Sequence, residues 1–228
     1  MEPDSSLRRV RVWDLPTRLF HWSLAVAVAA SFVTAKLGGN AMAWHLRLGL
    51  LALALLAFRV LWGFFGGHWS RFASFIYLPA SLRDYLRGSS GPGGRFEIGH
   101  SPLGALAVFA MLGLLAVQVA TGLVADDEVA TVGPLNRFVS SALAARASAW
   151  HSHWGQWLIF ALVGTHVVAV LYYLRVRKND ILRPMLHGDK PLPPDTTASA
   201  DGWARRLLAL ALFGATATLA WWVGQLGQ

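Results

Sequence analysis

Long apolar runs alternate with polar segments along the whole chain. The five runs cover residues 15–36, 43–65, 102–125, 150–175 and 203–225. Each is close to the ~20 residues that an α-helix needs to cross the hydrocarbon core of a bilayer. The pattern predicts an all-α integral membrane protein, with a four-helix transmembrane bundle and a fifth, C-terminal transmembrane helix. For the first run alone, a secretory signal peptide ending near Val33-Thr34-Ala35 is the alternative.

The connections between the runs indicate the domain organisation. Short helices are predicted at residues 78–86 and 135–146, outside the spans. The loop 191–200, rich in Pro, Asp and Thr, separates the last run from the other four. We therefore assign residues 1–192 to one transmembrane domain and residues 193–228 to a linker and the C-terminal helix.

The composition excludes two classes of protein. Hydrophobic residues make up 55% of the chain and charged residues 14%, against roughly 45–50% and 25% in soluble domains. So little polar surface excludes a soluble globular domain, and so many apolar residues exclude a disordered chain.

The basic residues are sorted between the two sides of the predicted membrane. Four precede or begin the first run, four lie between the second and third runs, and seven end or follow the fourth, which places 15 of the 20 on one side. The positive-inside rule puts that side in the cytoplasm of a bacterial inner membrane. The N-terminus is then cytoplasmic and the C-terminus periplasmic. The net charge of +8 thus reflects topology, and no nucleic-acid partner is expected.

The chain has no cysteine. That excludes disulfides, thiolate zinc sites, cysteine-ligated iron–sulfur clusters and covalent attachment of c-type haem. A redox metal would have to be held by other side chains, and histidine is the natural candidate.

Histidines occur at matching depths in three of the predicted spans. His21 lies near the cytoplasmic end of the first run, and His166 lies deep in the fourth, toward the same side. His45 begins the second run on the periplasmic side, where His151 and His153 begin the fourth. Ionisable groups inside spans are costly and usually functional. Two histidine pairs at opposite depths are what bis-imidazole ligation of two b-type haems requires.

Helix geometry discriminates between the two periplasmic candidates of the fourth run. His151 lies fifteen residues before His166, which places it roughly 60° away from the face of His166. His153 lies thirteen residues before it, roughly 140° away. We therefore favour His151, with His153 as its rival. Structural histidines at the membrane interface are the alternative, and a zinc site at this pair lacks further ligands.

Other polar residues in the spans have candidate roles. Arg18 and Arg59 are placed to neutralise the propionates of a cytoplasmic haem, and Arg47 those of a periplasmic one; snorkelling to the interface is the alternative for each. Gln118 and Thr121 can line a quinone site, although Thr121 can instead bond to its own helix. Three glycines beside the predicted sites leave room for a flat macrocycle: Gly49, Gly155 and Gly164.

Several short motifs occur in a recognisable order. They are Val12-Trp13-Asp14-Leu15-Pro16-Thr17-Arg18-Leu19-Phe20-His21-Trp22, His45-x-x-x-Gly49, Phe58-Arg59-Val60-Leu61-Trp62-Gly63-Phe64, Gly99-His100-Ser101-Pro102-Leu103-Gly104, Thr121-Gly122, Gly155-Gln156-Trp157 and Arg183-Pro184-Met185-Leu186-His187-Gly188-Asp189-Lys190. Over residues 10–192 the chain resembles the bacterial di-haem cytochrome b561 family, which includes the b-type subunits of nickel–iron hydrogenases.

The resemblance implies a core of four helices holding two haems b, with ligands from the first, second and fourth spans. Carried over, His21 and His166 ligate the cytoplasmic haem, and His45 and a histidine at the start of the fourth span ligate the periplasmic one. Family members usually place that last histidine fourteen residues before its partner, where this chain has Ser152.

The sequence therefore predicts an electron-transfer subunit of a quinone-linked oxidoreductase. Electrons would pass between a periplasmic redox protein, such as a hydrogenase-like subunit, and the membrane quinone pool. One alternative is a superoxide:quinone oxidoreductase, with Lys36 and Arg47 steering the anion. A further alternative is a haem-free protein, either a small transporter or a membrane anchor subunit.

Overall fold

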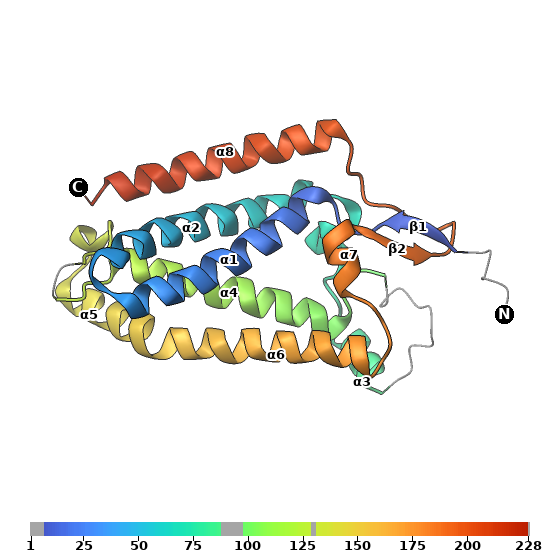
Figure 1. Ribbon diagram of the computed structural model, residues 1–228, viewed down its shortest axis with the longest axis horizontal. Coiled ribbons are helices and arrows are strands. Elements are labelled where there is room, and N and C mark those ends of the chain that lie inside the picture. The colour runs from blue at the N-terminus through green and yellow to red at the C-terminus, as the bar shows by residue number, and fades with distance from the viewer. Residues whose placement is uncertain (1–6, 88–97, 129–130, 228) are drawn as a thin grey trace. The chain divides into compact units, whose positions relative to one another are not determined.

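Five long helices make up most of the computed structural model, which describes residues 7–87, 98–128 and 131–227 (Figure 1). They are α1 (Leu15–Leu37), α2 (Met42–Phe65), α4 (Pro102–Val124), α6 (Gln156–Arg175) and α8 (Trp203–Gln225). All five are long and apolar enough to cross a membrane. Their bounds lie within one residue of the predicted runs, except that α6 begins six residues later, because a π-helix (Trp150–Gly155) precedes it.

Shorter elements fill the connections. They are the strands β1 (Arg8–Arg11) and β2 (Asp189–Leu192), the helices α3 (Pro79–Leu86), α5 (Ser141–Ala149) and α7 (Leu182–His187), and the single 3₁₀ turns Gly39–Ala41, His68–Ser70, Phe72–Ser74 and Asn136–Phe138. The predicted helix at 78–86 corresponds to α3. The predicted helix at 135–146 is displaced: α5 begins only at Ser141, because the Ser140 hydroxyl caps it by accepting from the Leu143 amide at 3.3 Å.

The strand pair departs from an all-α architecture. β1 and β2 lie side by side and antiparallel, with Arg8 opposite Leu192 and Arg11 opposite Asp189 (Figure 1). Strands of four residues carry little periodicity of their own, and each is stabilised by a partner that is remote in sequence. The fold is thus mostly helical, with one two-stranded sheet in the described residues.

The chain divides into two compact units. Unit 1 comprises residues 1–19, 60–109 and 166–209, and unit 2 comprises residues 20–59, 110–165 and 210–228. Each long helix contributes one end to unit 1 and the other end to unit 2. The three connections rich in Arg and Lys belong to unit 1.

A buried carboxylate organises the core of unit 1. Asp14 is fully buried at the N-cap of α1. Its Oδ1 accepts hydrogen bonds from the Thr17 amide at 2.8 Å and from the Trp62 indole at 3.1 Å. Its Oδ2 accepts from the Gly67 amide at 2.9 Å and from the Ser70 hydroxyl at 2.6 Å. The carboxylate thereby ties the start of α1 to the end of α2 and the turn that follows it.

Aromatic contacts link the helix segments of unit 2. The Phe32 and Phe160 rings meet edge to face at 4.4 Å, which joins α1 to α6. The Phe58 and Phe213 rings meet in the same way at 6.1 Å, which joins α2 to α8.

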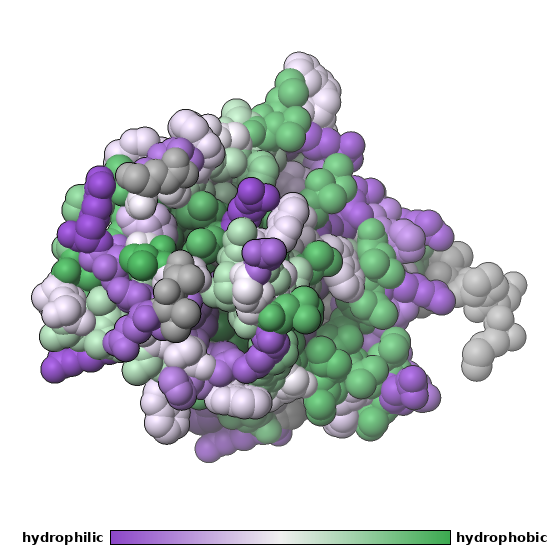
Figure 2. Space-filling view, turned by 60° about the vertical axis from the view of Figure 1, so that its left-hand side comes forward, coloured by the Kyte–Doolittle hydropathy of each residue, from purple (hydrophilic) through white to green (hydrophobic). Residues whose placement is uncertain are grey.

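Large apolar side chains also lie on the outer surface of the helices. Val26, Val168 and Leu210 are about two-thirds exposed, and Figure 2 shows hydrophobic side chains in green over much of one face of the molecule. Soluble proteins rarely expose apolar surface of this extent to water, whereas in a membrane the lipid tails would cover it. This surface supports the assignment of the chain as a membrane protein.

Candidate functional site

Two of the predicted ligands meet inside unit 2. His45 lies in the first turn of α2, and His151 lies in the π-helix that precedes α6. Their ring centres are 5.9 Å apart, and the ring planes are almost perpendicular, at 82°. Both side chains are half-buried. Residues more than a hundred positions apart in the sequence therefore present two imidazoles to one place.

Backbone carbonyls fix the orientation of both rings. His45 Nδ1 lies 2.8 Å from the Ser31 carbonyl oxygen, and His151 Nδ1 lies 2.8 Å from the Gln118 carbonyl oxygen. Because a carbonyl oxygen only accepts, each Nδ1 must carry the proton and donate it. In the neutral imidazole the other nitrogen, Nε2, then keeps its lone pair. This is the arrangement by which ligating histidines are commonly held, with Nε2 available to a metal.

The π-helix explains the unusual spacing before His166. A π-helical turn accommodates one residue more than an α-helical turn does. With the π-helix Trp150–Gly155 in the path, the fifteen residues from His151 to His166 advance about as far around the axis as fourteen residues of regular α-helix. The extra residue is thus absorbed locally.

The rival histidine is directed elsewhere. His153 is exposed, and its Nδ1 lies 2.8 Å from the Ser152 hydroxyl. That hydroxyl also donates to the Ser148 carbonyl at 2.7 Å. Neither Ser152 nor His153 contributes to the pair formed by His45 and His151.

Residues of α4 support the His151 ring, and the sequence alone did not identify this role. The Gln118 side-chain amide donates to the His151 carbonyl at 2.9 Å, and its Oε1 packs against Gly155, where a Cβ would collide with it. A Cβ on Gly122 would lie 2.6 Å from His151 Cε1. Gly122 therefore leaves the space that the imidazole occupies. The available signals were the polar Gln118 and the glycine at position 122 within a largely apolar span.

The quinone-site candidates of α4 are engaged within the protein. Gln118 holds the π-helix, as described above. The Thr121 hydroxyl donates to the Val117 carbonyl of its own helix at 2.8 Å, which is the alternative that the sequence left open.

The pair formed by His45 and His151 fits a haem iron. Metal–imidazole bonds are about 2 Å long, so ring centres 5.9 Å apart suit two imidazoles that bind one iron from opposite sides. A Cβ on Gly49 or Gly164 would meet no atom within 4 Å, and Gly49 lies on the same helix face as His45, one turn further along. A zinc site has less support, because the described residues contain no group of three or more His, Cys, Asp or Glu.

The remaining predicted site residues lie in both units. His21 lies in unit 2, half-buried, with its ring edge-on to Trp22 at 5.0 Å, and His166 lies in unit 1, also half-buried. Arg59 of α2 is only 3% exposed, so it does not snorkel.

The two other arginines make local contacts. Arg18 Nη1 donates to the Leu186 carbonyl at 2.6 Å. The Arg47 guanidinium lies over the Trp44 ring, 4.9 Å from its centre. Both contacts leave part of each guanidinium available to an anion.

We expect Gly122→Val to remove the haem that His45 and His151 would hold, because the added side chain would occupy the space of the imidazole. The haem-to-protein ratio of the purified protein should fall by about one half. Gly113→Ala on the same helix is the control, since its Cβ would meet no atom within 4 Å. A full haem content in Gly122→Val would contradict the assignment of this site.

Comparisons with known proteins match the chain to b-type cytochromes. The profile of the prokaryotic cytochrome b561 family matches residues 12–188. The chain is also 23% identical, over 216 residues, to a protein of Bradyrhizobium diazoefficiens named "Probable Ni/Fe-hydrogenase B-type cytochrome subunit". That alignment covers 79% of this chain and 85% of the relative. No solved structure matches the chain.

Proposed function

The chain belongs to the prokaryotic cytochrome b561 family, and from this premise we propose that it is a di-haem cytochrome that carries electrons across the membrane. Membership of this family makes the chain a bacterial membrane protein and a b-type cytochrome that takes part in electron transfer. The proposal adds the number of haems, their ligands and the two redox partners.

The observation that carries the proposal is the pair formed by His45 and His151. The two ring centres lie 5.9 Å apart, and each ring is oriented by a backbone carbonyl oxygen 2.8 Å from its Nδ1. Bound haem iron supplies a carrier that gains and loses one electron. If His45 and His151 both bound the iron, they would leave no ligand position for oxygen and would favour outer-sphere electron transfer.

His21 and His166 are the proposed ligands of the second haem. Their matching depth in the first and fourth spans supports this assignment. Arg59 is also buried within a span, at 3% exposed, and ionisable groups inside spans are usually functional. We propose that Arg59 and Arg18 bind the propionates on the cytoplasmic side and that Arg47 binds those on the periplasmic side.

The charge distribution supports the direction of insertion. The connections rich in Arg and Lys would lie in the cytoplasm, next to the inner membrane, and the sparsely charged connections would lie in the periplasm. The name of the relative supports a hydrogenase-like protein as the periplasmic partner. The membrane quinone pool would be the other partner.

Spectroscopy tests the haem content. The purified protein should show b-type bands in a reduced-minus-oxidised spectrum and about two haems per chain in a pyridine haemochrome assay. His166→Ala should lower that number to about one. The absence of b-type bands would favour the haem-free transporter or anchor.

Rapid mixing tests the partners. We expect a quinol, or a reduced hydrogenase-type partner, to reduce the haems of the reconstituted protein. If superoxide reduced them rapidly and the other two donors did not, the superoxide:quinone oxidoreductase would replace our proposal.

A further inference from the structure

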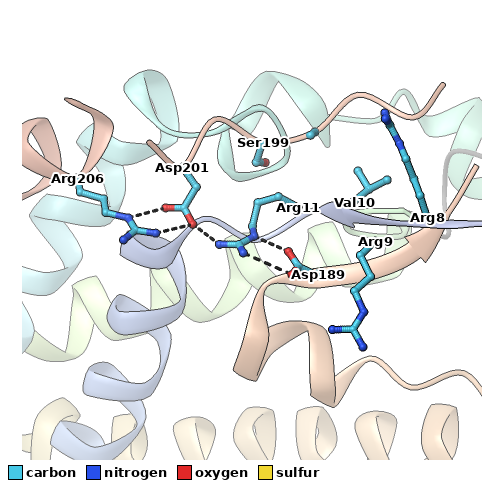
Figure 3. A pocket seen from close by; sticks show the side chains of 9 residues that line it. Arg8, Arg9, Val10, Arg11, Asp189, Ser199, Asp201 and Arg206 are labelled. Carbon is cyan, nitrogen blue, oxygen red and sulfur yellow. Dashed lines mark hydrogen bonds and ion pairs between the residues drawn. The ribbon is translucent and has the colours of Figure 1, made fainter. Parts of the chain in front are cut away.

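A pocket of about 560 Å³ opens beside β1 in unit 1 (Figure 3). Its wall is formed by β1, the first residue of β2, the loop that leads into α8 and the first turn of α8. The charged side chains that line it are Arg8, Arg9, Arg11, Arg206, Asp189 and Asp201. Four cations face two anions, so the lining carries a net charge of +2.

Two of the four arginines are neutralised inside the pocket. Arg11 Nε donates to Asp189 Oδ1 at 2.5 Å, and its Nη1 contacts Asp201. Arg206 Nε lies 3.3 Å from Asp201 Oδ1. Burial raises the pKa of Asp201, but hydrogen bonds and charges from Arg206 and Arg11 outweigh it and hold that pKa below its usual value. Both carboxylates are therefore paired with these two arginines.

Arg8 and Arg9 remain uncompensated. Both are exposed, and within the described residues neither side chain makes an ion pair or a hydrogen bond. As neighbours in a strand they project to opposite faces of β1 (Figure 3). Both residues line the pocket, Arg8 on one face of β1 and Arg9 on the other, and neither has a carboxylate partner among the described residues.

Hydrogen bonds hold the wall of the pocket in place. The Ser199 amide donates to the Arg11 carbonyl at 2.7 Å, and the Ser199 hydroxyl donates to the Val12 carbonyl, also at 2.7 Å. The Leu15 amide donates to Asp201 Oδ1 at 3.1 Å. The loop before α8 is thereby fixed to β1 and to the start of α1, so that the pocket is preformed.

We propose that this pocket binds the phosphodiester of an anionic phospholipid headgroup. Guanidinium groups are well suited to phosphate, because they donate two parallel hydrogen bonds to its oxygens. A lipid is favoured over a soluble phosphate because the pocket adjoins the first turn of α8, a candidate span, and the exposed Trp203 begins that helix. Exposed tryptophans at span ends are typical of the headgroup level. Basic pockets beside spans on the cytoplasmic side are known to bind anionic lipids.

Native mass spectrometry of the full chain tests the proposal. The protein, purified with its haem, is released from nanodiscs that contain equal amounts of phosphatidylglycerol and phosphatidylcholine. We expect the wild type to retain phosphatidylglycerol selectively. The double variant R8Q/R9Q should retain it about 30-fold less, at roughly five-fold for each arginine near a membrane surface. Both side chains are exposed, so haem content and thermal unfolding should not change.

A matched variant separates a built site from general attraction. R83Q/R87Q removes the same two charges from α3 and from the residue after it, also within unit 1. It should retain the lipid as the wild type does, and an equal loss in both double variants would overturn the proposal. Displacement of the lipid by millimolar inorganic phosphate would assign the pocket to a soluble anion and overturn the lipid assignment.

Discussion

Replacing His151 by alanine will remove one of two haems, whereas replacing His153 will remove none. The His151 ring faces His45 at 5.9 Å with its Nδ1 on the Gln118 carbonyl, and His153 is exposed beside Ser152. In His151→Ala one axial position would have no protein ligand. The haem-to-protein ratio should then fall from about two to about one, and the remaining bands should belong to the other haem.

Two further variants make this result specific. His45→Ala should lose the same haem, so that the double variant H45A/H151A still retains one haem rather than none. Deletion of Ser152 should leave two haems, because it reduces the spacing from His151 to His166 to fourteen residues, so that an ordinary α-helix can replace the π-helix. The loss of a haem from His153→Ala but not from His151→Ala would reverse the ligand assignment.

Replacing Asp14 by alanine will destabilise the protein more than any other single change in unit 1. Four buried donors would lose their acceptor, namely two backbone amides, an indole and a hydroxyl. An unsatisfied buried donor costs roughly 1–3 kcal/mol, so the free energy of unfolding should fall by about 4 kcal/mol or more. The loss should appear as a large decrease in the thermal unfolding temperature of the solubilised protein.

Asp195→Ala is the matched control, because Asp195 is exposed in the loop before α8. We expect it to unfold at the wild-type temperature. Asp14→Asn keeps the shape of the side chain but replaces one acceptor oxygen by an NH₂ group, which only donates. That group would point at two other donors, so the variant should also be strongly destabilised. Wild-type stability of Asp14→Asn would show that the four hydrogen bonds do not support the fold.

The sequence predicted the helical part of the fold well. Membrane-spanning helices have a strong local signal, because a run of about 20 apolar residues is rarely found in any other kind of element. The run at 203–225 matches α8 at both ends. The strands β1 and β2 were missed because each has four residues and depends on pairing with a remote segment.

The candidate site was predicted only in outline. Matching depths suggested that His45 would meet His151 or His153, and the structure brings His45 and His151 together. The sequence did not identify the supports of the His151 ring. Gln118 and Gly122 lie in another helix, and their role depends on packing that no local pattern encodes.

The sequence by itself determined the spans, the sorting of basic residues between the connections and the place of each histidine along its span, because all three follow from position along the chain and from the cost of polar groups in lipid. Helix geometry already favoured His151 over His153, but only the tertiary structure shows how the His151 ring is held 5.9 Å from that of His45. His151 lies in the π-helix, its carbonyl accepts from the Gln118 side chain, and its ring occupies space that a Cβ on Gly122 would take. Contacts between helices, rather than the preferences of one helix, fix the direction of that ring.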